Sequence, residues 1–403
     1  FGLDSITDSS KRRESFAFDS SGHLQKVTSA SGRSLFFSWA TPVGATSAHI
    51  QTVSSDPVDG AAITWTYGYS GDLLTTVCAP TSATPCTKYN YSSGNLYPQA
   101  VLNLGPASYW RLGESSGAQR AKSSVLANAG TDDATYNKVT LGSAPSLAGS
   151  TATTATFNGS SSYVKLLSRL ALGGAYQTLS MRFKAAAANG VIFSYQRDPV
   201  TKGTTDGNYT PSLYVGDDGH LMGEFWNGHA IYAMRSPASV VDNKWHDLAL
   251  VASGTSQAMY LDGAKVATLD GAVKLVSVNS VRSIYLGTGF IGESWRNEKY
   301  HGDPARPLWF KGAVSDVAFF DRALSDSEVA GLDSQTSAVQ QLTGITRPNG
   351  NTYASITYNT ASARVAKVVD EHGAAWTLNP MTVSGSSQVF ASAVLGGGPD
   401  NYW

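Results

Sequence analysis

Trp, Tyr, Arg and carboxylate side chains gather in three runs of the sequence, at residues 195–209, 224–232 and 289–304. Sugars bind by stacking the apolar face of a ring on Trp or Tyr, while carboxylates, amides and Arg hydrogen-bond their hydroxyl groups. The mixture therefore predicts a carbohydrate-binding surface. The alternative is that the two Trp residues only cap a core and that their charged neighbours are solvated. The candidate ligand-binding residues are Arg197, Asp198, Trp226, His229, Tyr232, Trp295, Glu298, Tyr300 and His301.

Patterns that would indicate catalysis are weak. Residues 113–117 fit G-x-S-x-G and residues 287–292 fit G-x-G-x-x-G, but neither run has the strand and helix that these motifs require around them. A glycosidase needs two carboxylates that flank the scissile bond, and no two of the seven Glu residues share one strand pattern. We therefore predict a protein that is not an enzyme and has no catalytic residue.

The two cysteines, Cys78 and Cys86, lie close together with two prolines between them. A loop that returns on itself could bring both thiols within bridging distance, and a disulfide implies an oxidising compartment. The alternative is two free thiols beside a turn. No His is close by, so a metal site at these cysteines is not supported.

The composition excludes several classes of function. The chain has 403 residues, 29 Lys and Arg against 30 Asp and Glu, and a net charge of −1. Without a basic patch, general binding to nucleic acid is not expected. No run reaches the roughly 18–20 apolar residues that span a membrane, so no membrane insertion is expected. Because the sequence begins at Phe1 and stops at Trp403 without a closing element, we expect it to be part of a longer polypeptide.

Short alternating runs bounded by Gly, Asp and Asn dominate the chain, for example residues 179–183 and 258–261. Such a pattern is typical of many short antiparallel strands and predicts an all-β sandwich or barrel. The one clear helix start is residues 325–328, Ser-Asp-Ser-Glu, which form a capping box.

An aromatic-x-aromatic pair, a glycine turn and an apolar return strand recur in the first hundred residues. The copies begin at Phe16, Tyr67 and Tyr89, and the alternation places both aromatic residues on one face of a strand. This pattern resembles the YD repeat of the RHS and teneurin-like family. In that family the hairpins form a large β-shell that often encloses a C-terminal toxin domain, which makes polymorphic toxins one expected context.

This repeated pattern stops near residue 102 and resumes near residue 342, where residues 342–350 resemble the return strand that the third copy lacks. An insertion at a hairpin tip explains the gap, because such exposed sites tolerate insertions. The expected organisation is a YD-repeat segment at 1–102, an inserted domain at 103–338 and a continuation of the repeats at 339–403.

The insert carries five separate blocks, at residues 105–114, 155–164, 244–251, 259–266 and 310–320. In this order they resemble the laminin-G-like, concanavalin A-like jelly roll of bacterial surface proteins. The resemblance implies two packed antiparallel sheets. It also implies a protein that is secreted or held at the cell surface of a bacterium.

Members of the laminin-G-like family often bind one structural calcium through two Asp residues. Asp316 matches the second of them, but Lys122 stands where the first is expected, and Asp132 or Asp133 could compensate. Calcium prefers about 6–8 oxygen ligands, so the loss of one carboxylate weakens the site. Calcium is thus the one cofactor that the resemblance implies, and it remains open.

Taken together, these observations predict a non-catalytic extracellular module that binds a glycan and is displayed on an RHS-type scaffold. The alternative is a structural or adhesive role with a cell-surface protein as partner, and a glycoside hydrolase ranks third. The rest of the same long polypeptide is expected as a further partner.

Overall fold

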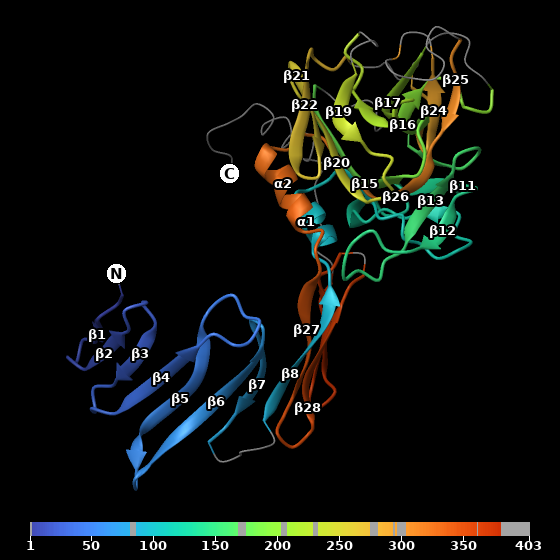
Figure 1. Cartoon of the computed structure of the whole chain (residues 1–403). Helices are drawn as coiled ribbons and strands as arrows, with labels where there is room; N and C mark the ends of the chain where they lie inside the picture. Colours follow the sequence, from blue (N-terminus) through green and yellow to red (C-terminus); the bar gives the residue numbers. More distant parts are fainter. Residues whose placement is uncertain are drawn as a thin grey trace. The chain divides into compact units, whose positions relative to one another are not determined.

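The computed structural model describes residues 2–80, 86–167, 175–202, 208–228, 233–274, 281–292, 295, 304–360 and 362–379. Strands dominate these residues, and every strand pair given below is antiparallel. The chain divides into two compact units. Unit 1 comprises residues 1–92, 340–358 and 365–379, and unit 2 comprises residues 93–339, 359–364 and 380–403. The predicted all-β antiparallel architecture is confirmed (Figure 1).

The described residues of unit 1 form one twelve-stranded sheet in the order β1-β2-β3-β4-β5-β6-β7-β8-β27-β28-β29-β30. Strand β8 pairs with β27, so the sheet continues across the long segment between them. The strands are β1 (Ser5–Thr7), β2 (Arg13–Phe18), β3 (Leu24–Thr28), β4 (Ser34–Ala40), β5 (His49–Val58), β6 (Ala61–Ser70), β7 (Leu73–Cys78), β8 (Thr87–Gly94), β27 (Val339–Thr346), β28 (Thr352–Tyr358), β29 (Val365–Asp370) and β30 (Ala375–Thr377).

One contact recurs along this sheet. The last aromatic residue of a strand donates a hydrogen bond to the backbone carbonyl of a Leu or Ile near the start of an earlier strand, at 2.8–3.0 Å. The residue before that Leu or Ile can be a His that stacks on the same aromatic ring, as His23 does on Trp39. The donor and acceptor pairs are Trp39 and Leu24, Tyr69 and Ile50, Tyr91 and Leu74, and Tyr358 and Leu342.

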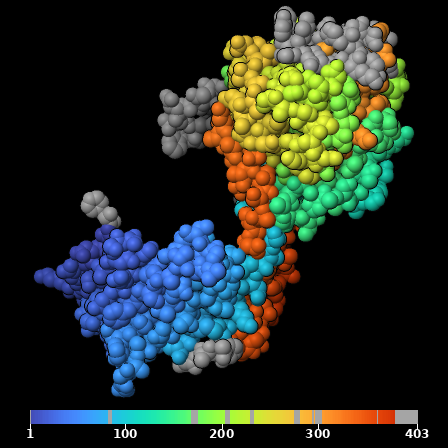
Figure 2. Space-filling view, in the orientation of Figure 1, coloured from blue at the N-terminus to red at the C-terminus, as the bar shows by residue number. Residues whose placement is uncertain are grey.

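Unit 1 is a single layer. Among its described residues only Ser34 and Cys86 are buried, although both faces carry apolar side chains. A sheet stabilises itself by burying an apolar face against another element, and no such element occurs within the described part of unit 1. Its strands are blue, cyan and red in the space-filling view (Figure 2). The exposed large apolar residues are Leu3, Ile6, Phe18, Leu35, Phe36, Val43, Val58, Ile63, Tyr353, Trp376 and Leu378.

Cys78, at the end of β7, forms a disulfide with Cys86, just before β8, with the two Cα atoms 4.4 Å apart. The predicted disulfide is therefore confirmed, and the alternative of two free thiols is wrong. The bridge closes the connection between two neighbouring strands.

Unit 2 is a sandwich of two sheets, here called sheet C and sheet B, with a short two-stranded sheet beside them. Sheet C consists of β10 (Arg120–Ala121), β11 (Ala134–Asn137), β14 (Tyr163–Leu166), β23 (Ser283–Leu286), β16 (Gly190–Gln196), β17 (Tyr209–Val215), β18 (His220–Gly223) and β19 (Met234–Ser239). Sheet B consists of β12 (Thr140–Ser143), β13 (Thr154–Asn158), β26 (Lys311–Phe320), β15 (Tyr176–Ala185), β20 (His246–Ser253), β21 (Ser256–Leu261) and β22 (Ala264–Asp270), with β9 (Ser108–Trp110) paired to β26.

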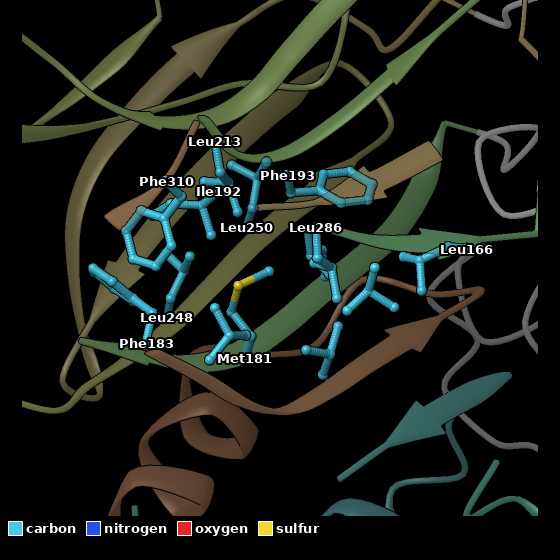
Figure 3. Close-up of a cluster of buried hydrophobic side chains, with 14 of the residues drawn as sticks. Leu166, Met181, Phe183, Ile192, Phe193, Leu213, Leu248, Leu250, Leu286 and Phe310 are labelled. Atoms are coloured by element: carbon cyan, nitrogen blue, oxygen red, sulfur yellow. The ribbon is translucent and has the colours of Figure 1, made fainter. Parts of the chain in front are cut away.

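The main core lies between these two sheets (Figure 3). Alternation along each strand sends every second side chain inward, so Leu248 and Leu250 of β20 join this core while Ala249 and Val251 face away from it. Sheet C contributes Ile192 and Phe193 to the same core, at a point where the register of β16 against β17 shifts. The sandwich thus has two further faces, one on the outside of each sheet.

Two helices cover the outside of sheet B: α1 (Tyr97–Asn103) and α2 (Asp326–Ser334). Helix α2 begins with the predicted capping box, because Ser325 accepts a hydrogen bond from the Glu328 amide and the Glu328 side chain accepts one from Ser325. Helix α1 was not predicted from the sequence. Its N-cap residue, Leu96, has no side chain that could cap it.

The outside of sheet C is covered by β24 (Thr288–Ile291) and β25 (Arg306–Trp309), which pair with each other. Ser194 of β16 donates a hydrogen bond to the Thr288 carbonyl (2.8 Å), and Gln196 accepts one from the Phe290 amide (3.1 Å). A small apolar cluster fills the space beneath them and includes Tyr214, Met222 and Trp295. These contacts fix the surface on which the candidate site lies.

Candidate functional site

The ends of several strands meet at one edge of sheet C. Strand β17 is antiparallel to both β16 and β18, so β16 and β18 run in the same direction and end at the same edge. Strand β16 is followed there by Arg197 and Asp198, and β18 is followed by residues 224–228. The topology therefore brings two of the three runs identified in the sequence to the same edge of the sheet.

Residues 224–228 leave β18 on a fixed path, because each of the first three contributes backbone groups to hydrogen bonds. The segment is tied to sheet C, to β21 of sheet B and to the connection after β22. The bonds run from Glu224 N to Ser212 O (2.9 Å), from Phe225 N to Gln257 Oε1 (2.7 Å), from Gln257 Nε2 to Phe225 O (2.8 Å), from Trp226 N to Tyr195 OH (2.7 Å) and from Lys274 N to Trp226 O (2.8 Å).

Trp226 and Trp295 lie together, with ring centroids 6.4 Å apart. Trp295 in turn contacts Tyr214 edge-on at 6.3 Å and is only 3% exposed, so its indole is part of the apolar cluster beneath β24. Trp226 is half-buried and packs against both this cluster and the main core. Trp226 can thus offer ring surface to a ligand, whereas Trp295 supports it from behind.

Arg197 and Asp198 form a loose ion pair, with Nε and Oδ1 4.0 Å apart and both side chains partly exposed. The Asp198 carbonyl accepts a hydrogen bond from Gln196 Nε2 at 2.6 Å, which fixes the start of this connection to the end of β16. Of the remaining sequence-predicted residues, His229, Tyr232, Glu298, Tyr300 and His301 lie outside the described residues.

Glu224 begins the second of the three sequence runs but was not among the predicted ligand-binding residues. Its side chain is fully buried (0% exposed), and neither carboxyl oxygen has a hydrogen-bond partner among the described residues. Burial raises the pKa of Glu224 to about 8, so the carboxyl is largely protonated in neutral solution. The hydroxyl of Ser212, which is also buried, lies beside that of Tyr195 and partly offsets the effect of burial on the pKa of Tyr195.

The tyrosine that anchors this segment lies in the same environment. Burial raises the pKa of Tyr195 to about 12, and the charge of Glu224 adds to the effect, which places the two side chains within electrostatic reach of each other. The signal available in the sequence was a single carboxylate in the apolar run from Leu221 to Trp226.

Asp316, the predicted calcium ligand, is engaged by an arginine. Its Oδ1 atom accepts hydrogen bonds from Tyr109 OH (2.6 Å) and Arg111 Nε (3.0 Å), and its side chain is 2% exposed. The Arg111 guanidinium thus binds the carboxylate that a calcium ion would need. The position does not fit a calcium ion as it stands, and calcium binding stays a prediction.

The other two predicted calcium ligands lie by β9 and β11. Asp133 Oδ1 accepts hydrogen bonds from the amides of Ser123 (3.1 Å) and Gly130 (3.3 Å), and the Asp132 carbonyl accepts one from the Trp110 indole (2.7 Å). In the part of the chain that the structure describes, no group of three or more His, Cys, Asp and Glu side chains could hold a metal ion.

One known protein family matches a large part of the sandwich in sequence. Residues 158–330 match the model of a family described as the concanavalin A-like lectin/glucanases superfamily. The sandwich is therefore similar to the jelly rolls of that family. The matched range covers most of sheets B and C, including β16, β18 and residues 224–228. No curated protein matches the chain in sequence.

Several solved structures are similar to this chain. One is domain 4 of AbnA, a GH43 extracellular arabinanase from Geobacillus stearothermophilus (17% identity, 57% of this chain and 98% of that one, TM-score 0.33). Others are the SAP-like pentraxin of Limulus polyphemus (18%, 47% and 91%, 0.31) and the CBM40 of the Ruminococcus gnavus IT-sialidase (18%, 41% and 85%, 0.29). At these low scores the likenesses say nothing about the ligand of this chain.

Proposed function

We propose that unit 2 is a non-catalytic carbohydrate-binding module whose ligand binds at the edge of sheet C where Trp226 lies. The observation that carries this proposal is the Trp226 segment. Hydrogen bonds fix its backbone, and Trp295 packs against its indole. The indole is only half-buried, so part of the side chain remains exposed. A ring held in one orientation with a free surface is what a stacked sugar requires. The lectin/glucanase family match supports the same class.

We further propose that unit 1 is a YD-repeat scaffold of an RHS-type protein that is secreted or held at a bacterial surface. Support comes from the aromatic-to-carbonyl hydrogen bond, which the copies that begin at Tyr67 and Tyr89 both form, and from the Cys78–Cys86 disulfide, since disulfides persist in oxidising compartments. Among the described residues no helix is long and apolar enough to cross a bilayer.

A structural or adhesive role is the second candidate, and the exposed apolar side chains of unit 1 favour it, because a single-layer sheet needs a covering partner. A glycoside hydrolase is the third. The raised pKa of Glu224 would suit a general acid, but the reaction also needs a second carboxylate. Two other buried carboxylates among the described residues, Asp247 and Asp316, are paired with arginines on sheet B.

A glycan array probed with the whole chain tests the carbohydrate proposal. We expect the chain to retain at least one glycan, and Trp226→Ala to weaken that binding about tenfold or more, which corresponds to about 1.4 kcal/mol. Trp245→Ala is the matched control, since Trp245 is also half-buried in unit 2 but lies before β20 and packs under Lys184. An array without any retained glycan, or equal losses in both variants, would exclude the proposed site and favour the adhesive role.

A further inference from the structure

Lys274 lies beside the segment that carries Trp226 and is held there by its backbone. Its amide donates a hydrogen bond to the Trp226 carbonyl at 2.8 Å. Its side chain packs over Gly228, where an added Cβ atom would lie 2.5 Å from Nζ and 2.7 Å from Cε of the lysine. Gly228 also has a φ of +102°, which favours glycine. The glycine therefore makes room for the lysine, whose ammonium group lies beside a residue only two positions from the candidate stacking ring.

The Lys274 ammonium is exposed and forms no ion pair with any of the described residues. Among the described carboxyl groups at this edge, Asp198 is paired with Arg197. Burial raises the pKa of Glu224 to about 8, which leaves that carboxyl largely protonated in neutral solution. Asp270, four residues before Lys274, is exposed and forms no ion pair within the described ranges. A positive charge beside the Trp226 segment therefore remains available to a bound molecule.

Two arginines add positive charge to the same edge of sheet C. Arg282 stands directly before β23, which is antiparallel to β16, so it lies where β16 ends. Its amide donates to the Gln196 carbonyl at 3.0 Å, and its side chain is exposed. Arg197 follows β16, and its ion pair with Asp198 is loose at 4.0 Å. Like charges gathered along one edge attract an oppositely charged ligand before it makes contact.

We propose that this edge binds an anionic sugar whose ring stacks on Trp226 and whose carboxylate or sulfate group pairs with the Lys274 ammonium. This inference rests on the proposed carbohydrate-binding function and adds the charge of the ligand. A lysine ammonium is a compact point charge with three donors and no preferred planar geometry, so it recognises a negative charge and not one particular oxyanion. The ligand thus supplies the counter-charge that the described residues do not give to Lys274.

The expected preference is modest, because Lys274 is exposed. An exposed ion pair changes an equilibrium constant by up to about fivefold, so a charged sugar should bind about three to five times more tightly than its neutral counterpart. Salt should remove this preference, since charges are screened beyond about 3 Å at 1 M ionic strength. Stacking on Trp226 does not depend on charge and should persist at high salt.

The test is a titration of the whole chain with free glucose, galactose, glucuronic acid, galacturonic acid and glucose 6-sulfate, followed by nuclear magnetic resonance at about 0.01 M and about 1 M sodium chloride. We expect at least one anionic sugar to bind more tightly than its neutral counterpart at low salt, and the ratio to approach one at high salt. Binding to a uronic acid alone or to the sulfate alone would name the charged group.

Variants assign the preference to Lys274. Lys274→Gln should bring the affinity for the anionic sugar down to that for its neutral counterpart, whereas Lys274→Arg should keep the preference because it keeps the charge. Lys244→Gln is the matched control, since Lys244 is an exposed lysine of unit 2 that lies before β20 and pairs with Asp242 at 3.9 Å. It should leave the preference unchanged.

The charge of the ligand and the carbohydrate-binding function can fail separately. Retention of neutral glycans alone on an array, or a preference for anionic glycans that Lys274→Gln leaves intact in either assay, would overturn the proposal. The binding function would still stand if Trp226→Ala weakened that retention. If the unaltered chain binds none of these sugars and no glycan on an array, the inference and the proposed function fail together.

Discussion

Replacing Arg111 with Met should destabilise unit 2 strongly, because Arg111 neutralises a buried carboxylate on the outside of sheet B. The Arg111 side chain is 10% exposed, and its Nε atom lies 3.0 Å from Oδ1 of Asp316, which is 2% exposed. Its Nη1 atom donates to the Thr360 carbonyl as well. Without the guanidinium, Asp316 would keep only the hydrogen bond from Tyr109, whose pKa burial and Asp316 raise well above the usual value.

The size of the effect follows from this burial. Removing one partner of a buried ion pair costs about 3–5 kcal/mol, since it leaves the other charge without compensation. One kcal/mol shifts the Tm by about 2–4 °C in a unit of this size, so we expect a decrease of about 6–20 °C for Arg111→Met.

Differential scanning calorimetry of the whole chain would measure the decrease, because the two units can give separate transitions. Arg111→Met/Asp316→Asn is the matched control and should recover most of the lost stability, as it removes both charges. Asn is the suitable replacement because Asp316 has a φ of +53°, which Asn tolerates better than most residues. EDTA should leave the Tm of the unaltered chain unchanged. A Tm for Arg111→Met within about 2 °C of that of the unaltered chain, or a clear loss on EDTA treatment, would refute the reasoning.

Two further predictions concern pH and redox state. His246 lies between Asp262 (2.9 Å) and Asp242 (3.2 Å), and the hydrogen bond to Asp262 raises its pKa above the usual value. The resulting stability is fully present below a pH of about 6.5 and is lost as the pH rises through the folded-state pKa. Urea unfolding should therefore show a larger deficit for His246→Asn at low pH than at high pH, and a deficit independent of pH would contradict this. The Cys78–Cys86 bridge spans a sequence separation of 8, so Cys78→Ala/Cys86→Ala should cost unit 1 about 2.5 kcal/mol in chemical unfolding. Thiol titration of the unreduced chain should find no free thiol, and two reactive thiols would count against the bridge.

Local patterns predicted the elements that depend on neighbours in the sequence. The hairpin that begins at Phe16 folds as expected because Asp19 accepts hydrogen bonds from the amides of Ser21 and His23, and Gly22 takes the positive φ of +85° that the turn requires. Helix α2 likewise begins where the box at Ser325 predicts it. Each of these signals lies within a few residues of the structure that it specifies.

Contacts between distant strands could not be predicted in the same way. Trp295 reads as an exposed stacking ring in its polar run, but Tyr214, eighty-one positions earlier in the sequence (295 − 214), holds it inside the cluster of sheet C. Asp316 matches a calcium ligand, whereas the charge that meets it comes from Arg111 at the other end of the insert. Only the folded sheet shows which residue faces these side chains.

The two outer faces of the sandwich differ in a way that bears on function. On sheet B the buried charges are paired, Arg111 with Asp316 and Arg182 with Asp247, and two helices cover them. On sheet C the carboxyl of Glu224 is buried and unpaired among the described residues, although an apolar side chain there would be more stable. Proteins keep such a group against its cost mainly where activity depends on it. The outside of sheet B therefore stabilises the unit, and we expect a ligand at the edge of sheet C beside Trp226.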